Sequence, residues 1–250
     1  MNDGTKLLLL PGLMNDGRVW QNQLPVLRSS HREVVVATTF AQDTVAALAS
    51  EAIARMPAGP FAVAGFSLGG YVALEVFRQA RQRVLGMALL DTGARADSEQ
   101  SRQLRQRMID GVATGSADFS AVAASFLPRL VHPSRVEDSS LTELLISMAR
   151  SVGAEGFARQ QRAAMARPDS VGMLPEITCP TLILCGREDQ VTPPEWSEEM
   201  ARKIPAAKWL VIPHCGHMAP LEQPGAVNAA MDAWLAGIEG DDSKRFAPER

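Results

Sequence analysis

The chain of 250 residues is 46% hydrophobic and 21% charged, with a formal net charge of −3 at pH 7. This size and composition suit one globular α/β domain with a substantial core, or such a domain plus a modest insertion. The mild negative charge excludes the strongly basic surface that is typical of nucleic-acid-binding proteins and of proteins drawn to an acidic membrane.

Several short apolar runs, each bounded by glycine, proline or a charged residue, predict buried strands. They lie at 6–10, 33–38, 61–66, 84–90, 181–185 and 208–212. Because these runs are continuously apolar and rich in valine, leucine and isoleucine, they favour a parallel sheet covered on both faces. Helical periodicity follows at 43–56, 72–80 and 226–237, where Gly237 is expected to end the last helix. Strands that alternate with helices predict a doubly wound α/β fold with a mostly parallel sheet.

Residues 94–170 break this alternation, because they contain no convincing strand. They show helical segments around 98–113, 118–127, 139–151 and 154–166. A helical block of this size between two strands predicts an insertion that lies over the sheet as a cap. The core domain is then expected to comprise 1–93 and 171–238, and the polar segment 239–250 is expected to form a flexible tail.

The cysteines and the first residues bear on the compartment. The chain has three cysteines, an odd number, and none forms a C-x-x-C pair: Cys179, Cys185 and Cys215. We therefore do not expect a disulfide framework, and we expect a reducing compartment, the cytoplasm. The stretch MNDGTKLLLLPG has four consecutive leucines before a proline, too few for a signal-peptide core or a membrane span. We therefore expect a soluble cytoplasmic protein.

The apolar run 61–66 leads into Gly-Phe-Ser-Leu-Gly at 65–69, which matches the pattern G-x-S-x-G. A helical pattern follows at once, so the motif lies between a strand and a helix. Such a turn holds its central residue in a strained backbone conformation and exposes the hydroxyl above the sheet edge, beside the helix N-terminus. We therefore predict Ser67 as a nucleophile. The alternative is a glycine corner whose serine has no chemical role.

A serine hydroxyl is a poor nucleophile at neutral pH, so it needs a base, and the base needs an orienting group. Of the four histidines, His31 lies in a polar loop and is predicted at the surface, while His132 precedes a proline and is predicted as a turn or packing residue. His214 and His217 both follow the last predicted strand. His217 comes after a glycine on a loop and is the preferred base. His214 is closer to the strand end, where a structural hydrogen bond is expected.

The orienting acid should lie on a loop at the same edge of the sheet. Asp189 follows a predicted strand and a glycine, on a loop that leads into a helix begun by proline. Asp91 is the rival, because it also ends a predicted strand. With Asp189, the residues occur in the chain order Ser67, Asp189, His217, which is the order of the triad in α/β-hydrolases.

Acyl transfer also requires donors for a developing oxyanion. The backbone N–H of Leu68, directly after the predicted nucleophile, is one expected donor. The second should come from a loop after an early strand, and residues 7–20 supply such a loop. Gly12 lets the chain turn there, which makes the N–H of Leu13 the expected second donor.

The chain resembles capped α/β-hydrolases of the esterase, enol-lactonase and non-haem perhydrolase group. The resemblance covers roughly residues 5–236 and rests on the stretches PGLMNDGRVW, GFSLGGYVAL, PTLILCGREDQVTPP and IPHCGHMAPLEQP. It implies the α/β-hydrolase fold and the triad of Ser67, Asp189 and His217. It also implies oxyanion donors at Leu13 and Leu68, with 94–170 as the lid.

Two positions compare informatively with that group. Many relatives carry His-Gly where this chain has Pro11-Gly12. That histidine helps to fix the loop but does not itself donate, so the resemblance implies that the oxyanion hole survives here. Haloalkane dehalogenases and epoxide hydrolases of this fold use an aspartate at the nucleophile position, so Ser67 argues against both activities.

These residues predict a serine hydrolase that acts on a small ester, lactone or thioester through an acyl-enzyme, with no metal or organic cofactor. The expected partner is a small-molecule acyl substrate, with neither nucleic acid nor membrane. Hydrolysis of carbon–carbon bonds and perhydrolysis remain alternatives, because both reuse the same triad. A slow-turnover receptor on this fold is a further alternative of a different class.

Substrate contacts are expected close to the triad and in the cap. Met14 lies beside the expected donor and Met218 beside the expected base, so both are predicted to touch a substrate. Phe126 and Phe157 of the cap are candidates too, although helix packing is the simpler expectation for each. A carbon–carbon hydrolase would need a polar group for a dienoate carboxylate. Three cap arginines could supply it, Arg129, Arg135 and Arg162, with surface ion pairing as the simpler expectation.

Overall fold

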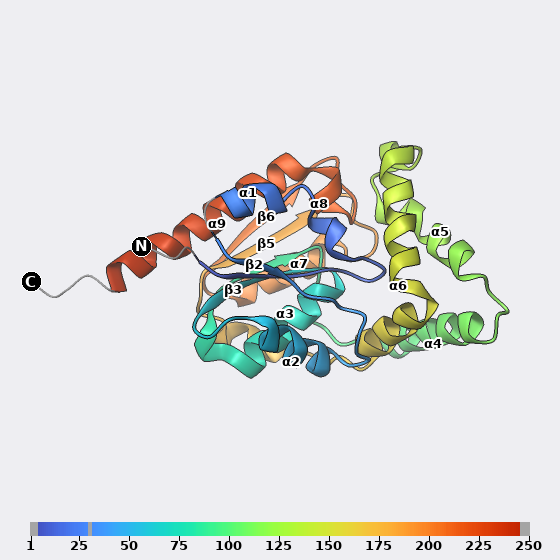
Figure 1. The fold of residues 1–250 in the computed structure, drawn as a ribbon, viewed down its shortest axis with the longest axis horizontal. Helices are drawn as coiled ribbons and strands as arrows, with labels where there is room; N and C mark the ends of the chain where they lie inside the picture. Colours follow the sequence, from blue (N-terminus) through green and yellow to red (C-terminus); the bar gives the residue numbers. More distant parts are fainter. Residues whose placement is uncertain (1–4, 30–31, 246–250) are drawn as a thin grey trace, which may run out of the picture.

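The fold is built on one six-stranded parallel sheet with the strand order β2-β1-β3-β4-β5-β6. The computed structural model describes residues 5–29 and 32–245. The strands are β1 (Leu7–Leu10), β2 (Val34–Val36), β3 (Phe61–Phe66), β4 (Val84–Leu90), β5 (Thr181–Gly186) and β6 (Ala207–Ile212). Each predicted apolar run forms a strand, and the predicted doubly wound α/β fold is confirmed (Figure 1).

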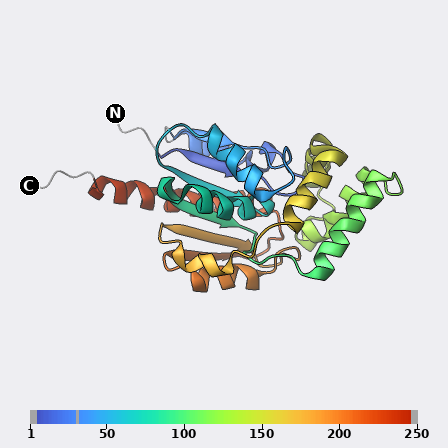
Figure 2. The same ribbon diagram turned by 90° about the horizontal axis from the view of Figure 1, so that it is seen from below.

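Alternate side chains of β1, β3, β4 and β5 enter two separate apolar layers. In β1, Leu8 and Leu10 pack in one layer, and Leu7 and Leu9 in the other. The first layer is covered by α2 (Val45–Arg55), α3 (Leu68–Ala80) and α7 (Pro194–Lys203). The second is covered by α1 (Leu24–Ser29) and α9 (Pro224–Arg245). Figure 2 shows the first set of helices from their own side of the sheet. Burial of both faces explains why the central strands are uniformly apolar rather than alternating. The expectation of a buried strand at 208–212 is wrong, because β6 is an edge strand on which Trp209 and Leu210 are exposed.

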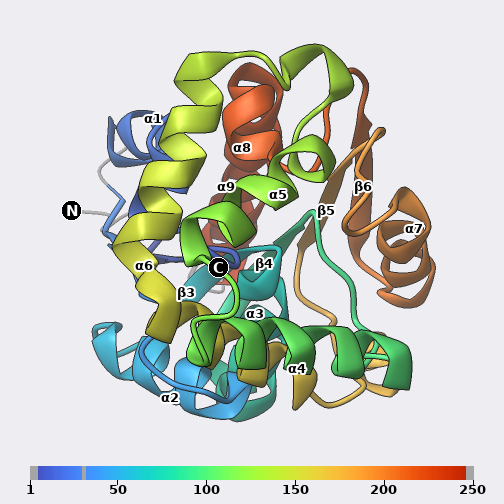
Figure 3. The same ribbon diagram turned by 90° about the vertical axis from the view of Figure 1, so that its right-hand side faces the viewer.

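Residues 94–170 form helices and contain no strand. They are α4 (Glu99–Ala113), α5 (Phe119–Leu130) and α6 (Ser139–Met165). The two helices expected at 139–151 and 154–166 form α6, which is interrupted at Gly153, where φ is 71° and ψ is 169°. All three helices stand over the end of the sheet at which the strands terminate (Figure 3). The division of the chain into core and cap at these boundaries stays a prediction.

Shorter elements complete the chain. They are η1 (Gly17–Trp20), η2 (Arg81–Arg83), η3 (Pro133–Arg135), η4 (Val171–Glu176) and α8 (Ala219–Glu222). Within the described ranges, no helix combines the length and the apolar composition that crossing a membrane requires.

The C-terminal helix is longer than the sequence predicts. α9 continues to Arg245, so the expectation that Gly237 ends it is wrong, and 239–245 is helical rather than irregular. Two long-range contacts account for the extension. Ile238 is buried in the apolar layer beneath α9, and Arg32 donates to both carboxylate oxygens of Glu239 at 2.8 and 2.9 Å. Residues 246–250 of the predicted tail lie outside the described residues.

Candidate active site

Ser67 occupies the sharp turn between β3 and α3. Its φ of 54° and ψ of −118° lie in a region that non-glycine residues rarely adopt. The flanking glycines permit this turn: a Cβ on Gly65 would lie 2.2 Å from the Gly69 carbonyl oxygen, and one on Gly69 would lie 2.1 Å from that of Leu10. The N–H of Ser67 donates to Leu90 O at 2.9 Å, which ties the turn to the neighbouring strand. The turn therefore holds the hydroxyl at the end of the sheet.

His217 lies on the loop that follows β6, with its ring directed at Ser67. Its Nε2 is 2.9 Å from Ser67 Oγ, and the residue is 2% exposed. The His217 backbone N–H donates to Leu130 O at 2.8 Å, so the end of α5 helps to hold this loop. The ring also contacts Phe66, with ring centroids 5.3 Å apart. Burial and these contacts restrict the imidazole to one orientation.

Asp189 follows β5 and contacts the other nitrogen of the same ring. Its Oδ2 is 2.8 Å from His217 Nδ1, and its Oδ1 accepts from the N–H groups of Val191 and Thr192 at 2.7 and 3.0 Å. Burial opposes ionisation of the carboxyl, but the charge and hydrogen bond of His217, together with the bonds from Thr192, lower the pKa of Asp189 below its ordinary value. An ionised carboxylate only accepts, so Nδ1 carries the proton and Nε2 can accept from the Ser67 hydroxyl.

The other histidines lie away from this chain of hydrogen bonds. His214 is exposed, and its ring stands edge-on to His132 with centroids 5.9 Å apart. His132 Nδ1 is 2.8 Å from Ser134 Oγ, as fits the expected turn residue. His31 lies outside the described residues. The structure therefore brings only His217, among the described histidines, to Ser67.

Asp91, the rival acid, is fully buried at the end of β4. Its Oδ1 accepts from the Gly186 N–H at 2.8 Å. Burial, followed by the negative charge of Asp189, raises the pKa of Asp91 well above its ordinary value. Asp91 is thus suited to the neutral form, and Asp189 contacts His217 in its place.

The expected oxyanion donors lie on either side of Ser67. Leu68 begins α3, where the first N–H groups of a helix have no partner within the helix. Leu13 lies on the loop after β1. Across residues 5–29 and 32–245, neither of these two N–H groups donates a hydrogen bond to another protein atom. Both remain available to a bound group.

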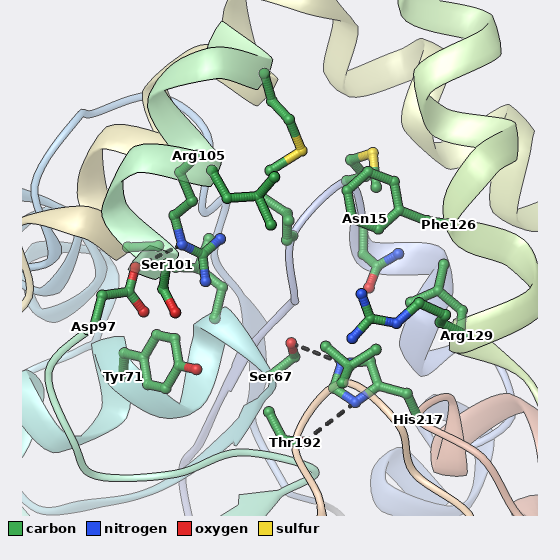
Figure 4. A pocket seen from close by; sticks show the side chains of 18 of the residues that line it. Asn15, Ser67, Tyr71, Asp97, Ser101, Arg105, Phe126, Arg129, Thr192 and His217 are labelled. Carbon is green, nitrogen blue, oxygen red and sulfur yellow. Dashed lines mark hydrogen bonds and ion pairs between the residues drawn. The ribbon is translucent and has the colours of Figure 1, made fainter. Parts of the chain in front are cut away.

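A cavity of about 200 Å³ opens above Ser67 and His217 (Figure 4). Among the predicted substrate contacts, Met14, Met218 and Phe126 line it, as do Leu13 and Leu68. Phe157 does not, so its prediction as a cavity residue is wrong. It is 0% exposed and packs against Phe119, with ring centroids 5.4 Å apart, in the apolar cluster among α4, α5 and α6.

The cavity wall also carries two arginines. Arg105 pairs with Asp97 at 2.7 Å, and Asp97 also pairs with Arg167 at 2.6 Å. Arg129 donates to Gln190 O at 3.0 Å and has no carboxylate partner among the described residues. Figure 4 shows the Arg129 guanidinium on the His217 side of the cavity and Arg105 on the opposite side.

The other two cap arginines named from the sequence do not line the cavity. Arg135 pairs with Asp138 at 2.7 Å, and Arg162 is exposed. Ion pairing therefore accounts for Arg135. Of the three arginines, Arg129 is the one placed to meet a substrate.

Sequence reasoning missed Thr192, which lines the cavity and contacts the triad residues. Its hydroxyl donates to Asp189 Oδ2 at 2.7 Å and lies 3.3 Å from His217 Nδ1. The available signal was its position three residues after an aspartate on a strand-end loop, where Asp and Thr often form local hydrogen bonds.

No group of three or more potential metal ligands occurs in the described part of the chain.

Comparison with known proteins places the chain in a family. A model described as the alpha/beta hydrolase family matches residues 7–230. The chain belongs to the alpha/beta hydrolase family. It is therefore an enzyme of the hydrolase class.

The chain is similar to several esterases and to a lactonase. A thermophilic esterase from Thermogutta terrifontis, solved with malate bound, is 32% identical, with a TM-score of 0.83 over 94% of this chain and 90% of that one. The pimeloyl-acyl-carrier-protein methyl ester esterase of Neisseria meningitidis is 26% identical over 82% of this chain and 67% of its own length. The enol-lactonase of Burkholderia xenovorans LB400 shares the fold at 21% identity, with a TM-score of 0.84 over 94% of this chain and 92% of that one.

Proposed function

We propose that this hydrolase cleaves small carboxylic esters, lactones or thioesters through an acyl-enzyme on Ser67. One observation carries the proposal: Ser67 Oγ, the His217 ring and the Asp189 carboxylate form a continuous chain with contacts of 2.9 and 2.8 Å. Ser67 and His217 line the cavity, as do Leu13 and Leu68. A nucleophile, a base and an orienting acid in hydrogen-bond contact are what acyl transfer to serine requires.

In this mechanism, His217 Nε2 takes the Ser67 proton as Oγ attacks the substrate carbonyl. Asp189 keeps Nδ1 protonated and stabilises the imidazolium that forms. The N–H groups of Leu13 and Leu68 donate to the oxyanion. His217 then gives its proton to the leaving group as the bond from the carbonyl carbon to that group breaks. In the second half His217 takes a proton from the attacking water and returns it to Ser67 Oγ as the bond between Oγ and the acyl group breaks. One preformed oxyanion donor is typically worth ~3–4 kcal/mol at such a site.

Two esterase relatives support the choice of carboxylic esters: the Thermogutta esterase at 32% identity and the Neisseria methyl ester esterase at 26%. The cavity of about 200 Å³ favours small acyl groups. Carbon–carbon hydrolysis and perhydrolysis use the same three residues and are separated from ester hydrolysis by substrate, not by this geometry.

The test is a panel of p-nitrophenyl esters, lactones and thioesters of graded acyl size, assayed with the wild type and with Ser67→Ala. Rapid turnover of short acyl groups by the wild type, absent from Ser67→Ala, is expected. Tight binding of the same compounds without turnover by the wild type would contradict the proposal and favour a receptor. Activity on carbon–carbon substrates alone would contradict the substrate class.

A further inference from the structure

A buried glutamine of α6 holds the loop that carries Leu13. Gln160 is 0% exposed and lies in the part of α6 that follows the interruption at Gly153. Its Oε1 accepts from the Met14 N–H at 2.8 Å. Its Nε2 donates to Gly12 O at 3.2 Å and contacts Thr39 Oγ1 at 3.3 Å. A single amide side chain therefore binds the main chain on both sides of Leu13.

These two contacts, with the hydrogen bond from the Asn15 N–H to Gly12 O at 3.2 Å, hold the direction of the Leu13 N–H. Gly12 C=O and Leu13 N–H belong to one planar trans peptide, in which the two groups point in opposite directions. Fixing the Gly12 oxygen toward Gln160 therefore fixes the Leu13 N–H on the opposite side of that plane. Fixing the Met14 N–H holds the next peptide plane as well. With both planes held, the backbone torsions of Leu13 have little freedom.

The loop needs such support, because part of it is strained. Met14 has a φ of 56°, in the left-handed region that costs a non-glycine residue ~1–2 kcal/mol. Without an acceptor, the buried Met14 N–H would carry a further desolvation penalty. Pro11, just before the turn, has no N–H and no polar side-chain atom with which to anchor the loop. Gln160 thus supplies the acceptor for the Met14 N–H and adds a second donor to the Gly12 oxygen, which also accepts from the Asn15 N–H at 3.2 Å.

A second contact ties the same loop to the other half of α6. Arg18 donates to Ser147 Oγ at 2.7 Å and to Ser151 Oγ at 2.8 Å, and both serines precede Gly153. The loop after β1 is therefore attached to α6 on both sides of the interruption. The position of α6 therefore affects the geometry of the loop after β1.

We propose that Gln160 is a positioning residue that aims the Leu13 N–H at the oxyanion, and that α6 thereby completes the reaction site. This inference rests on the proposed function. Gln160 does not touch the reacting atoms and acts through the peptide plane of Leu13. Its loss should weaken binding of the transition state more than binding of the substrate, which lowers kcat and kcat/KM together and leaves KM nearly constant.

The test compares Gln160→Met with Gln161→Met. Both wild-type residues are glutamines with 0% exposure, but Gln161 accepts from Arg105 at 2.6 Å and, among the described residues, makes no hydrogen bond to the loop after β1. On a short neutral p-nitrophenyl ester, Gln160→Met is expected to lose about 10- to 100-fold in kcat with KM within about threefold. The inhibition constant of a trifluoromethyl ketone, which binds as an oxyanion, should rise by the same factor. Gln161→Met should keep both kcat and this inhibition constant within about twofold.

A further variant separates hydrogen bonding from packing. In Gln160→Glu, burial favours the protonated carboxyl, which offers one acceptor and one donor as glutamine does. It is expected to retain at least about tenfold more kcat than Gln160→Met, and it serves as the informative variant if Gln160→Met does not fold. Equal kcat in the two folded Gln160 variants would show that the side chain acts through packing and would overturn the inference.

The outcomes also separate this inference from the proposed function. If Ser67→Ala is inactive while Gln160→Met keeps full kcat and inhibitor affinity, the role of Gln160 is wrong and the nucleophile stands. If Ser67→Ala retains turnover, both are overturned, because there is then no Ser67 oxyanion for Leu13 to bind.

Discussion

Thr192 donates its hydroxyl to Asp189 Oδ2 at 2.7 Å, and the same carboxylate oxygen lies 2.8 Å from His217 Nδ1. The acid is therefore held by a local residue as well as by the base that it orients. This arrangement gives Asp189 a lowered pKa although the residue is buried, since burial alone would raise it.

Replacing Thr192 by valine should make stability depend differently on pH. A carboxyl with a lowered folded-state pKa stabilises the fold above its unfolded pKa of ~3.9, and this stability is lost as the pH falls through the folded value. A hydrogen bond to a charged group contributes ~1.5–3 kcal/mol. Thr192→Val should therefore be less stable than the wild type by about that amount at pH 7, with a smaller difference below pH ~4.

Urea unfolding of Thr192→Val at pH 7 and pH 3.5 measures this effect, with Thr192→Ser, which keeps the hydroxyl, as the control. A stability difference of equal size at both pH values would show that the hydroxyl does not act on the ionised carboxylate.

Mutation of the two buried aspartates, Asp189 and Asp91, should have clearly different effects on kcat. Asp189→Asn removes the charge that orients His217 and is expected to lower kcat by ~10³–10⁴-fold. Asp91→Asn keeps the oxygen that accepts from Gly186 at 2.8 Å and should retain kcat within about threefold. Steady-state kinetics of both variants on one ester decide the point. The reverse ranking would assign the role of orienting acid to Asp91.

The raised pKa of Asp91 predicts a dependence of stability on pH that is opposite in sign to that of Asp189. Because its folded-state pKa is raised, its contribution to stability is present below the unfolded value of ~3.9 and is lost as the pH rises through the folded value. The melting temperature of Asp91→Asn, measured relative to that of the wild type, should therefore increase from pH 5 to pH 8. A constant offset across this range would contradict the raised pKa.

Phe126 and Phe157 offer a matched pair for the cavity wall. Phe126 lines the cavity, whereas Phe157 is buried behind it. Phe126→Ala should shift the preferred acyl chain toward longer esters with little loss of stability. Phe157→Ala should cost ~3–5 kcal/mol of stability and leave the preference unchanged. Profiles of kcat/KM against acyl length, together with thermal melts, give the answer. Unchanged preference in Phe126→Ala would place the acyl group elsewhere.

The Arg129 guanidinium, which has no carboxylate partner among the described residues, should favour substrates that carry a carboxylate. An exposed charge pair is worth ~0.2–1 kcal/mol, which is fivefold at most, and it is screened by salt. Arg129→Ala is expected to raise KM by about two- to fivefold for a dicarboxylic acid monoester but not for its neutral counterpart, at low salt. Arg162→Ala, exposed and away from the cavity, is the control. Equal effects on both esters would exclude recognition of charge by Arg129.

Much of the fold could be predicted from the sequence, because strands buried on both faces leave uninterrupted apolar runs. The end of α9 could not, since it depends on Arg32, which is distant in sequence and binds Glu239. The glycine at 237 signals a helix end locally, and a long-range ion pair with burial of Ile238 overrides that signal.

The candidate site was predictable where its residues follow strands, as Ser67, Asp189 and His217 do. Residues whose position depends on tertiary packing were not. Phe126 and Phe157 are the same residue type on cap helices, and only the packing of α4, α5 and α6 decides which one meets the cavity. Gln160 has no local signal either, because a polar residue on a helix is usually solvated and its partners lie near the other end of the chain.

Mass spectrometry can identify the residue that carries the acyl group in the intermediate. The enzyme is mixed with a short-chain p-nitrophenyl ester, quenched in acid within the first turnover and digested for mass spectrometry. The acyl group is predicted on the peptide that carries Ser67, with no adduct and no turnover in Ser67→Ala. An acyl group on any other residue, or turnover that persists in Ser67→Ala, would contradict the account.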